Sequence, residues 1–202
     1  MIRRTLITMV LAGFGLLCAT ALFAGKYQTL CFEAEDGQNI SGKAWLVKAR
    51  KDDANNKISG KKVLALPQYA PGEKPPKDEV TYKVKIEQTG IYYLWARTYW
   101  KNGCGNSFYI KVEGYNSGNW IIGGDGTYNI MHWVCLADGG KNSGDPRPLM
   151  LKKGVVTITV GAKESATEID QFVLTTDPGY TPANIVKTTP AILVVDEKKS
   201  AK

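Results

Sequence analysis

Histidine is almost absent from this 202-residue chain, which contains only His132. A metal site built from several histidines is therefore excluded, and a histidine-based catalytic triad would depend on that one residue, with no nucleophile motif in the sequence. Dense basic runs of the kind that indicate nucleic-acid binding are also missing, although the formal net charge is +7. This charge is compatible with attraction to acidic polymers or with an ordinary soluble surface.

Cysteine is scarce as well, and Cys18 falls within an N-terminal segment that we expect to be removed. Three cysteines then remain, which allows at most one internal disulfide and leaves one thiol. Cys104 lies in the loop KNGCGN and Cys135 follows another glycine-rich loop. We favour a Cys104–Cys135 disulfide on loop flexibility, while the sequence itself does not fix the connectivity.

Long apolar runs are limited to the N-terminus. The run Leu6–Leu17 follows two arginines and precedes small residues, which predicts a secretory signal peptide over residues 1–24, cleaved after Ala21 or Ala24. An uncleaved anchor and a lipid attached at Cys18 are the alternatives. We expect a secreted, periplasmic or cell-surface protein with no membrane span in the mature chain.

Helical periodicity is nearly absent from the rest of the chain, whereas alternation of apolar and polar residues recurs. Val80–Glu87 and Val156–Val160 alternate cleanly, and glycine- and proline-rich turns separate such segments. The pattern predicts an all-β protein, an antiparallel β-sandwich of the jelly-roll type forming a single domain over residues 25–180. Further strands are expected near Thr29–Glu35, Ala44–Ala49, Lys62–Leu66, Ile91–Trp100, Ser107–Val112, Met131–Leu136 and Ile169–Thr176.

The predicted C-terminal extension, residues 181–202, has a different composition. Two Thr-Pro pairs precede the apolar run Ala191–Val195, and a polar tail follows it. The run could pack on the sandwich as an arm. It could instead add to the sheet edge of a neighbouring copy, which would make self-association possible.

The segment Ile91–Trp100 carries five aromatic residues in ten positions. Alternation predicts that Tyr92, Leu94 and Ala96 face the core, and that Tyr93, Trp95, Arg97 and Tyr99 share the opposite face. The exposed rings could bind a ligand, although plain packing explains each tryptophan equally well and explains the mid-strand Trp95 better.

Three acidic residues lie in the first and last predicted strands. Glu33 and Glu35 share one face of the first strand, and Asp170 shares a face with Phe172 and Leu174 in the last. The first and last strands of a sandwich often lie side by side, which would gather three carboxylates that a cation could join. Solvated acids, or acids paired with lysines, are the alternative.

Five segments in order, FEAEDG, GIYYLWAR, NSFYIKVEG, KKGVVTITV and IDQFVLTTDPGYTP, run from about Phe32 to Pro182. With these segments the chain resembles the family 6 and family 35 carbohydrate-binding modules, within the galactose-binding-like jelly rolls. The resemblance implies a structural calcium ion held by Glu33, Glu35 and Asp170, with a further backbone ligand near Lys57–Gly60.

The resemblance also implies that aromatic residues on loops or on an exposed sheet face bind sugar. The expected ligand-binding residues are Tyr99, Trp100, Tyr128, Trp133, Asn106 and Arg97, with Trp120 and His132 as weaker candidates. One departure is the sequence Lys163-Glu164-Ser165-Ala166, where relatives commonly carry arginine-glutamate-x-glycine. It replaces a planar bidentate donor with lysine.

These features predict a non-catalytic protein that binds a polysaccharide or other glycan, with an acidic ligand as one option. Apart from the acid cluster assigned to a cation, the sequence offers no pair of carboxylates of the kind that a glycoside hydrolase needs. The rival interpretation is an exported structural or adhesive subunit that binds protein or itself, since a fold does not determine a function.

Overall fold

The structure is a computed structural model of the chain and describes residues 27–54, 56–70, 72–115, 120–137 and 144–195. The predicted signal peptide, residues 1–24, and the tail 196–202 lie outside this part. The described residues contain no α-helix and one 3₁₀ turn, η1 (Ala34–Asp36). No helix in the described ranges is long and apolar enough to span a bilayer.

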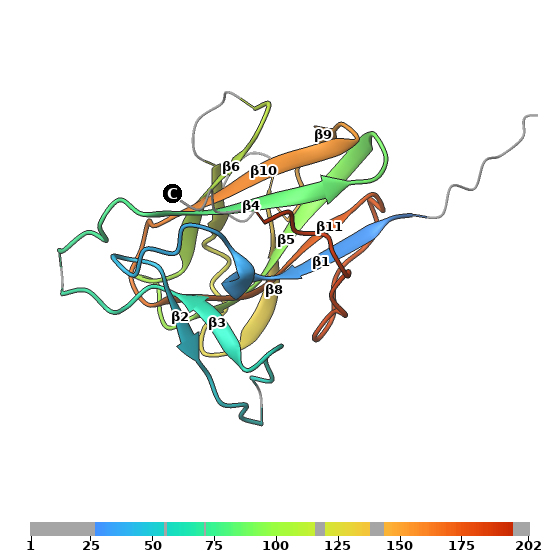
Figure 1. Cartoon of the computed structure of the whole chain (residues 1–202). Helices are drawn as coiled ribbons and strands as arrows, with labels where there is room; N and C mark the ends of the chain where they lie inside the picture. The colour runs from blue at the N-terminus through green and yellow to red at the C-terminus, as the bar shows by residue number, and fades with distance from the viewer. Residues whose placement is uncertain (1–26, 55, 71, 116–119, 138–143, 196–202) are drawn as a thin grey trace, which may run out of the picture.

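Two antiparallel sheets form a sandwich (Figure 1). The larger sheet has the order β2-β3-β11-β5-β8, with β1 paired to β11 and β9 paired to β5. Its strands are β1 (Thr29–Glu33), β2 (Leu46–Ala49), β3 (Lys62–Ala65), β5 (Gly90–Trp100), β8 (Met131–Cys135), β9 (Leu149–Leu151) and β11 (Thr167–Thr175). The smaller sheet has the order β4-β10-β6-β7, made of β4 (Glu79–Ile86), β10 (Gly154–Gly161), β6 (Ser107–Val112) and β7 (Trp120–Gly123).

The predicted all-β sandwich is confirmed, because each segment with apolar alternation forms a strand. In β4, for example, Val80, Tyr82, Val84 and Ile86 are buried between more exposed polar neighbours. The predicted contact between the first and last strands is also confirmed, since β1 pairs with β11 from Thr29–Thr175 to Glu33–Gln171. The short strands β7 and β9 had no clear alternation and were not predicted.

The core lies between the two sheets and is rich in aromatic rings. Phe32 and Tyr82 pack at 5.3 Å between ring centroids, and Phe32 stacks on Phe172 at 5.4 Å. Strand β5 contributes Tyr92, Leu94 and Ala96 to this core, as alternation predicts. Burial of such large apolar surfaces is the main favourable term in forming the sandwich.

The opposite face of the larger sheet, here called the outer face, carries the remaining side chains of β5. Strand register aligns them in cross-strand rows: Cys31–Val173–Trp95–Cys135, then Glu33–Gln171–Arg97–Trp133, then Leu46–Ala65–Glu168–Tyr99–Met131. The rows explain why both faces of β5 carry rings, because the outer face is itself partly covered. Trp95 is only 8% exposed, in a cluster that includes Tyr180 and Val186. This supports the interpretation that Trp95 packs in the fold and does not bind ligand through an open ring.

The chain after β11 forms the cover and then crosses to the other sheet. Gln171 and Val186 exchange two hydrogen bonds, and the Thr189 N–H donates to the Cys31 carbonyl at 2.8 Å. Beyond them, the N–H of Lys85 donates to the carbonyl of Ile192, and Leu193 bridges to Val84 of β4. The C-terminal arm therefore pairs with the β4 edge of its own chain, as expected of an arm that packs on the sandwich.

Candidate functional site

Three carboxylates meet on the outer face, where β1 ends and η1 begins. The Ser59 hydroxyl donates to Glu33 Oε1 at 2.5 Å, and the Ser59 N–H donates to Asp170 Oδ1 at 3.0 Å. Glu35 Oε1 lies against Gly60, where an added Cβ would come within 3.0 Å of it. The acids of the first and last strands and the segment Lys57–Gly60 are thus brought together.

Asp170 reaches this cluster because strand β11 is irregular at that residue. Pairing with β5 shifts register between Ile169 and Gln171, which leaves Asp170 as the extra residue of a β-bulge. The bulge turns Asp170 to the outer face and places Ile169 in the core. The sequence-based placement of Asp170 on the face of Phe172 was therefore wrong, because strict alternation cannot include a bulge.

The negative charge of these three carboxylates is only partly balanced by positive groups. Within the described chain, Glu33 Oε2 and Glu35 Oε2 are buried without a hydrogen-bond partner. Burial, together with the neighbouring charges of Glu33, Asp36 and Asp170, raises the pKa of Glu35 to about 7. Burial also raises the pKa of Asp170 to about 6, although Arg97 acts in the opposite direction.

These carboxylates suit a hard cation, which takes oxygen ligands. As the side chains stand, no three His, Cys, Asp or Glu residues of the described ranges are arranged as a metal site. The orphaned oxygens of Glu33 and Glu35 and the close approach of Gly60 nevertheless fit such an ion.

Two predicted ligand-binding residues are enclosed, and their assignment is corrected. Trp100 is fully buried in the core, and its indole N–H donates to Asp125 Oδ1 at 3.0 Å. Arg97 is 5% exposed and its Nη1 lies 2.6 Å from Asp170 Oδ2. Neither side chain offers an open face to a sugar. Trp100 was expected to bind because it borders a turn-rich segment, whereas as the last residue of β5 it turns its indole into the core.

Three other candidates meet at the end of the sandwich. The Tyr99 hydroxyl donates to Asn129 Oδ1 at 3.2 Å, and Asn106 Nδ2 donates to the Tyr128 hydroxyl at 3.4 Å. Tyr128 is 40% exposed, whereas Asn106 is 8% exposed. The group presents one open ring, that of Tyr128, beside amide groups.

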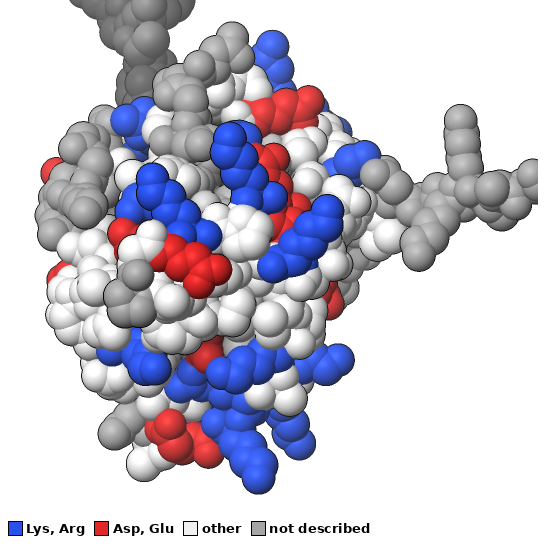
Figure 2. All heavy atoms as spheres, turned by 90° about the vertical axis from the view of Figure 1, so that its left-hand side faces the viewer, with Lys and Arg blue, Asp and Glu red and all other residues white. Residues whose placement is uncertain are grey.

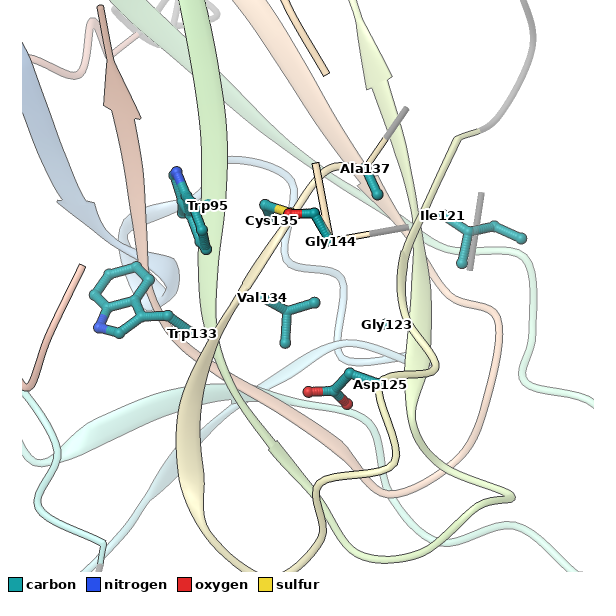
Figure 3. A pocket seen from close by; sticks show the side chains of 9 residues that line it. All are labelled: Trp95, Ile121, Gly123, Asp125, Trp133, Val134, Cys135, Ala137 and Gly144. Atoms are coloured by element: carbon teal, nitrogen blue, oxygen red, sulfur yellow. The ribbon is translucent and has the colours of Figure 1, made fainter. Parts of the chain in front are cut away.

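Trp133 lies elsewhere, beside a hollow of about 280 Å³ at the outer edge of β8, here called the β8-edge pocket. Its lining residues are Trp95, Ile121, Gly123, Asp125, Trp133, Val134, Cys135, Ala137 and Gly144. Figure 3 shows the two indoles on one side of β8, with Val134 and Asp125 on the other. The Trp133 ring is half-buried and is held by a hydrogen bond from Nε1 to the Asn184 carbonyl, 2.8 Å long.

Backbone groups of β8 add polar contacts to this pocket. The Leu136 N–H donates to the Leu94 carbonyl, which fixes the hydrogen-bonding register between β8 and β5. Since hydrogen-bonded positions alternate in antiparallel pairs, the N–H and C=O groups of Trp133 and Cys135 point away from β5. Among the described residues, β8 is the last strand of its sheet, so these groups lie on the side of the pocket.

Asp125 supplies the carboxylate of the pocket, and sequence analysis missed it. His132 Nε2 lies 2.7 Å from Asp125 Oδ2. Partial burial raises the pKa of Asp125, but the nearby His132 and the hydrogen bonds donated by the N–H groups of Thr127 and Trp100 outweigh this and lower it overall. The residue lies in the turn GGDGT, whose composition indicated a turn but gave no sign that it folds against β8.

The predicted Cys104–Cys135 disulfide is not formed, because both thiols are free. Cys135 pairs across from Trp95, whereas Cys104 follows the end of β5 at Trp100. Five strand residues span about 17 Å, and a disulfide needs Cα atoms within about 7 Å. Cys104 lies in the turn that follows β5, and in this structure that turn does not bring its thiol to Cys135.

Comparison with known proteins gives one related sequence and several similar folds. No protein-family model matches the chain. Over 108 residues the chain is 28% identical to the uncharacterized protein P23 of Formosa agariphila. The match covers 51% of this chain but only 26% of that protein, about a quarter of its length.

Among solved structures, the chain is similar to the GH26-CBM35 β-(1,4)-mannanase of Podospora anserina, with a TM-score of 0.50, 16% identity and coverage of 78% of this chain and 30% of that one. A family 35 carbohydrate-binding module of Clostridium thermocellum matches with a TM-score of 0.46, 13% identity and coverage of 73% and 97%. A Cellvibrio mixtus module in complex with cellotriose matches with a TM-score of 0.46, 17% identity and coverage of 71% and 94%. The fold is of the family 6 and 35 carbohydrate-binding type, as the resemblance implied.

Proposed function

We propose that this chain is a non-catalytic glycan-binding protein, and that the β8-edge pocket binds one sugar unit of the ligand. The observation that carries the proposal is the combination of three features: the part-exposed indole of Trp133, the edge of β8 with which no described strand pairs, and the Asp125 carboxylate. An aromatic face suits the C–H-rich face of a pyranose, and convergent polar groups suit its hydroxyls. The fold supports the same class of function by analogy.

The exposed ring of Tyr128 provides a second contact for a longer glycan. At the same end of the sandwich, Asn106 donates a hydrogen bond to the Tyr128 hydroxyl, and Tyr99 bonds the side chain of Asn129, the residue that follows Tyr128. Extended polysaccharides commonly need more than one contact, because each exposed stacking contact contributes little energy by itself.

We also propose a structural calcium ion at Glu33, Glu35 and Asp170. Two orphaned carboxylate oxygens in a buried setting support it, since a bound cation would supply the missing positive charge. The ion would tie the first strand, the last strand and the Ser59 segment together and would stabilise the folded state by binding. Its role would be structural, with no part in a reaction.

The rival function, an assembly subunit, depended on a free apolar C-terminal strand. In the structure Ile192 is 6% exposed and the arm pairs with β4 of its own chain. This contact favours glycan binding over assembly. The predicted export signal is consistent with a protein that meets polysaccharides outside the cell.

The experiment is a glycan screen of the mature chain, run with calcium and with a chelator. We expect retention on at least one polysaccharide, lost in Trp133→Ala and kept in Trp133→Phe. As a matched control, Tyr27→Ala removes a ring that is 59% exposed and lies before β1. Absence of binding to every glycan by the folded protein would overturn the proposal, and loss only in Tyr128→Ala would move the main contact to the end of the sandwich.

A further inference from the structure

The β2–β3 hairpin, Lys48–Lys62, is the most basic segment of the chain. It contains six basic residues and two acidic ones, so it carries +4 of the total charge of +7. Figure 2 shows Lys and Arg gathered at the lower end of one face, where Figure 1 places this hairpin, with a smaller group of acidic atoms beside them. Charges of one sign on a single hairpin repel each other, which favours a polyanionic partner.

Four of these lysines have no ionic partner within the described residues. Lys51, Lys57, Lys61 and Lys62 are exposed, and no ion pair joins them to an acid. The two acids of the hairpin are occupied in holding its turn. Asp52 accepts the N–H of Ile58 at 3.0 Å, and Asp53 accepts the side-chain amide of Asn56 at 2.9 Å.

The hairpin is also fixed in place, so the lysines project from a firm support. Ile58 is 6% exposed, and Asn56 Oδ1 accepts the N–H of Met131 in β8 at 2.7 Å. A preorganised surface loses less conformational entropy on binding than a mobile lysine tail.

A groove of about 290 Å³ adjoins the hairpin and continues its charge. Lys48, Tyr99, Lys101 and Glu168 line it. Lys48 Nζ lies 2.9 Å from Glu168, which also pairs with Arg50, and the Arg50 guanidinium lies 4.1 Å from the centre of the Tyr99 ring. The groove therefore carries a net charge of +2, from Lys48, Arg50 and Lys101 against Glu168. The Tyr99 ring supplies aromatic surface.

We infer that the β2–β3 hairpin and this groove bind the acidic groups of an anionic polysaccharide, carboxylated or sulfated. The inference rests on the proposed function and names the ligand class. The groove receives one charged sugar unit between Lys48 and Lys101, and the unpaired lysines contact the charges of neighbouring units. Each such contact is weak and screened by salt, so several must act together.

The test compares the binding of the mature chain to polygalacturonate, dextran sulfate and neutral dextran, with duplex DNA as a further polyanion. The variant Lys51→Gln/Lys57→Gln/Lys62→Gln removes three hairpin charges. The variant Lys152→Gln/Lys153→Gln/Lys187→Gln removes three exposed charges outside the hairpin and the groove. All six residues are exposed, so both proteins should keep the wild-type melting temperature.

We expect the hairpin variant to bind one of the two acidic polysaccharides about tenfold more weakly, since three exposed charge contacts are lost, and the control variant to change less than about twofold. Tighter binding of polygalacturonate would indicate recognition of carboxylates, and tighter binding of dextran sulfate would indicate recognition of sulfates. Equal losses in both variants, tighter binding of DNA than of either polysaccharide, or binding only to neutral glycans would each overturn the inference. In the last case the proposed glycan-binding function would stand, whereas it would fall if no glycan of any charge bound.

Discussion

Arg97 and Asp170 form an ion pair on the outer face of the larger sheet, with Nη1 2.6 Å from Oδ2 and side-chain exposures of 6% and 0%. The pair exists because a β-bulge in β11 turns Asp170 toward the arginine of the neighbouring strand. It links the carboxylate cluster to the strand that carries the aromatic rings.

Removing Arg97 should strongly destabilise the fold. In Arg97→Met the carboxylate of Asp170 stays buried without its partner, which should cost about 3–5 kcal/mol of unfolding free energy. The control Lys111→Met breaks a pair with Glu79 in which both side chains are about half exposed, and should cost less than about 1 kcal/mol. Urea denaturation measures both, and equal costs would contradict a structural role for Arg97.

Calcium should stabilise the protein in a manner that depends on pH. Without the ion, burial holds the pKa of Glu35 at about 7, above its ordinary value of 4.5. The metal-free fold therefore loses stability as pH rises from about 4.5 toward 7, because Glu35 must ionise in a buried site. Calcium binds the ionised form, so it should raise the melting temperature near pH 8 and have little effect near about pH 5.

The variant Glu35→Gln is the control for this effect, since it keeps the size of the side chain but cannot ionise. Its melting temperature should respond weakly to calcium and to a chelator at either pH. If calcium leaves the melting temperature of the unaltered chain unchanged at about pH 8, the ion does not bind at this cluster.

Sequence alternation predicted the sandwich and the inner face of β5 because burial imposes a period of two on each strand. It failed at Asp170, where one extra residue inverts the faces. Trp100 was assigned to ligand binding because a turn follows it, although it shares the inward register of Tyr92, Leu94 and Ala96. Alternation could not reveal the β8-edge pocket. Asp125 and Trp133 lie in different segments, and only the tertiary fold places them at one edge.

Trp100 and Tyr128 were both predicted to bind ligand, and they should now differ sharply in their effect on stability. Trp100→Ala empties a fully buried site and should cost about 3–5 kcal/mol. Tyr128→Ala removes a ring that is 40% exposed and should change stability by less than about 1 kcal/mol. Thermal unfolding of the two variants compares them, and similar costs would show that Tyr128 is part of the core.

The C-terminal arm offers a test between glycan binding and assembly. Deleting residues 191–202 uncovers the β4 edge, so we expect the shortened chain to associate more than the intact one. Light scattering after gel filtration measures this. An intact chain that is oligomeric and becomes monomeric on deletion would instead support the assembly function.

The three cysteines outside the predicted signal peptide should react unequally with a thiol reagent. Cys104 is exposed, whereas Cys31 and Cys135 are buried, and burial together with the nearby carboxylates raises the pKa of Cys31 to about 12. One thiol should react in the native protein and three after denaturation. A purified chain with a single reactive thiol after denaturation would instead indicate an internal disulfide.

The central claim, that the β8-edge pocket binds sugar, is tested most directly by calorimetric titration of one polysaccharide from the screen into three folded proteins. The intact chain and Tyr27→Ala should bind with equal affinity. Trp133→Ala should bind about tenfold more weakly or not at all, since central aromatic contacts dominate such interfaces. Equal affinity of Trp133→Ala and the intact chain for that polysaccharide would contradict the account.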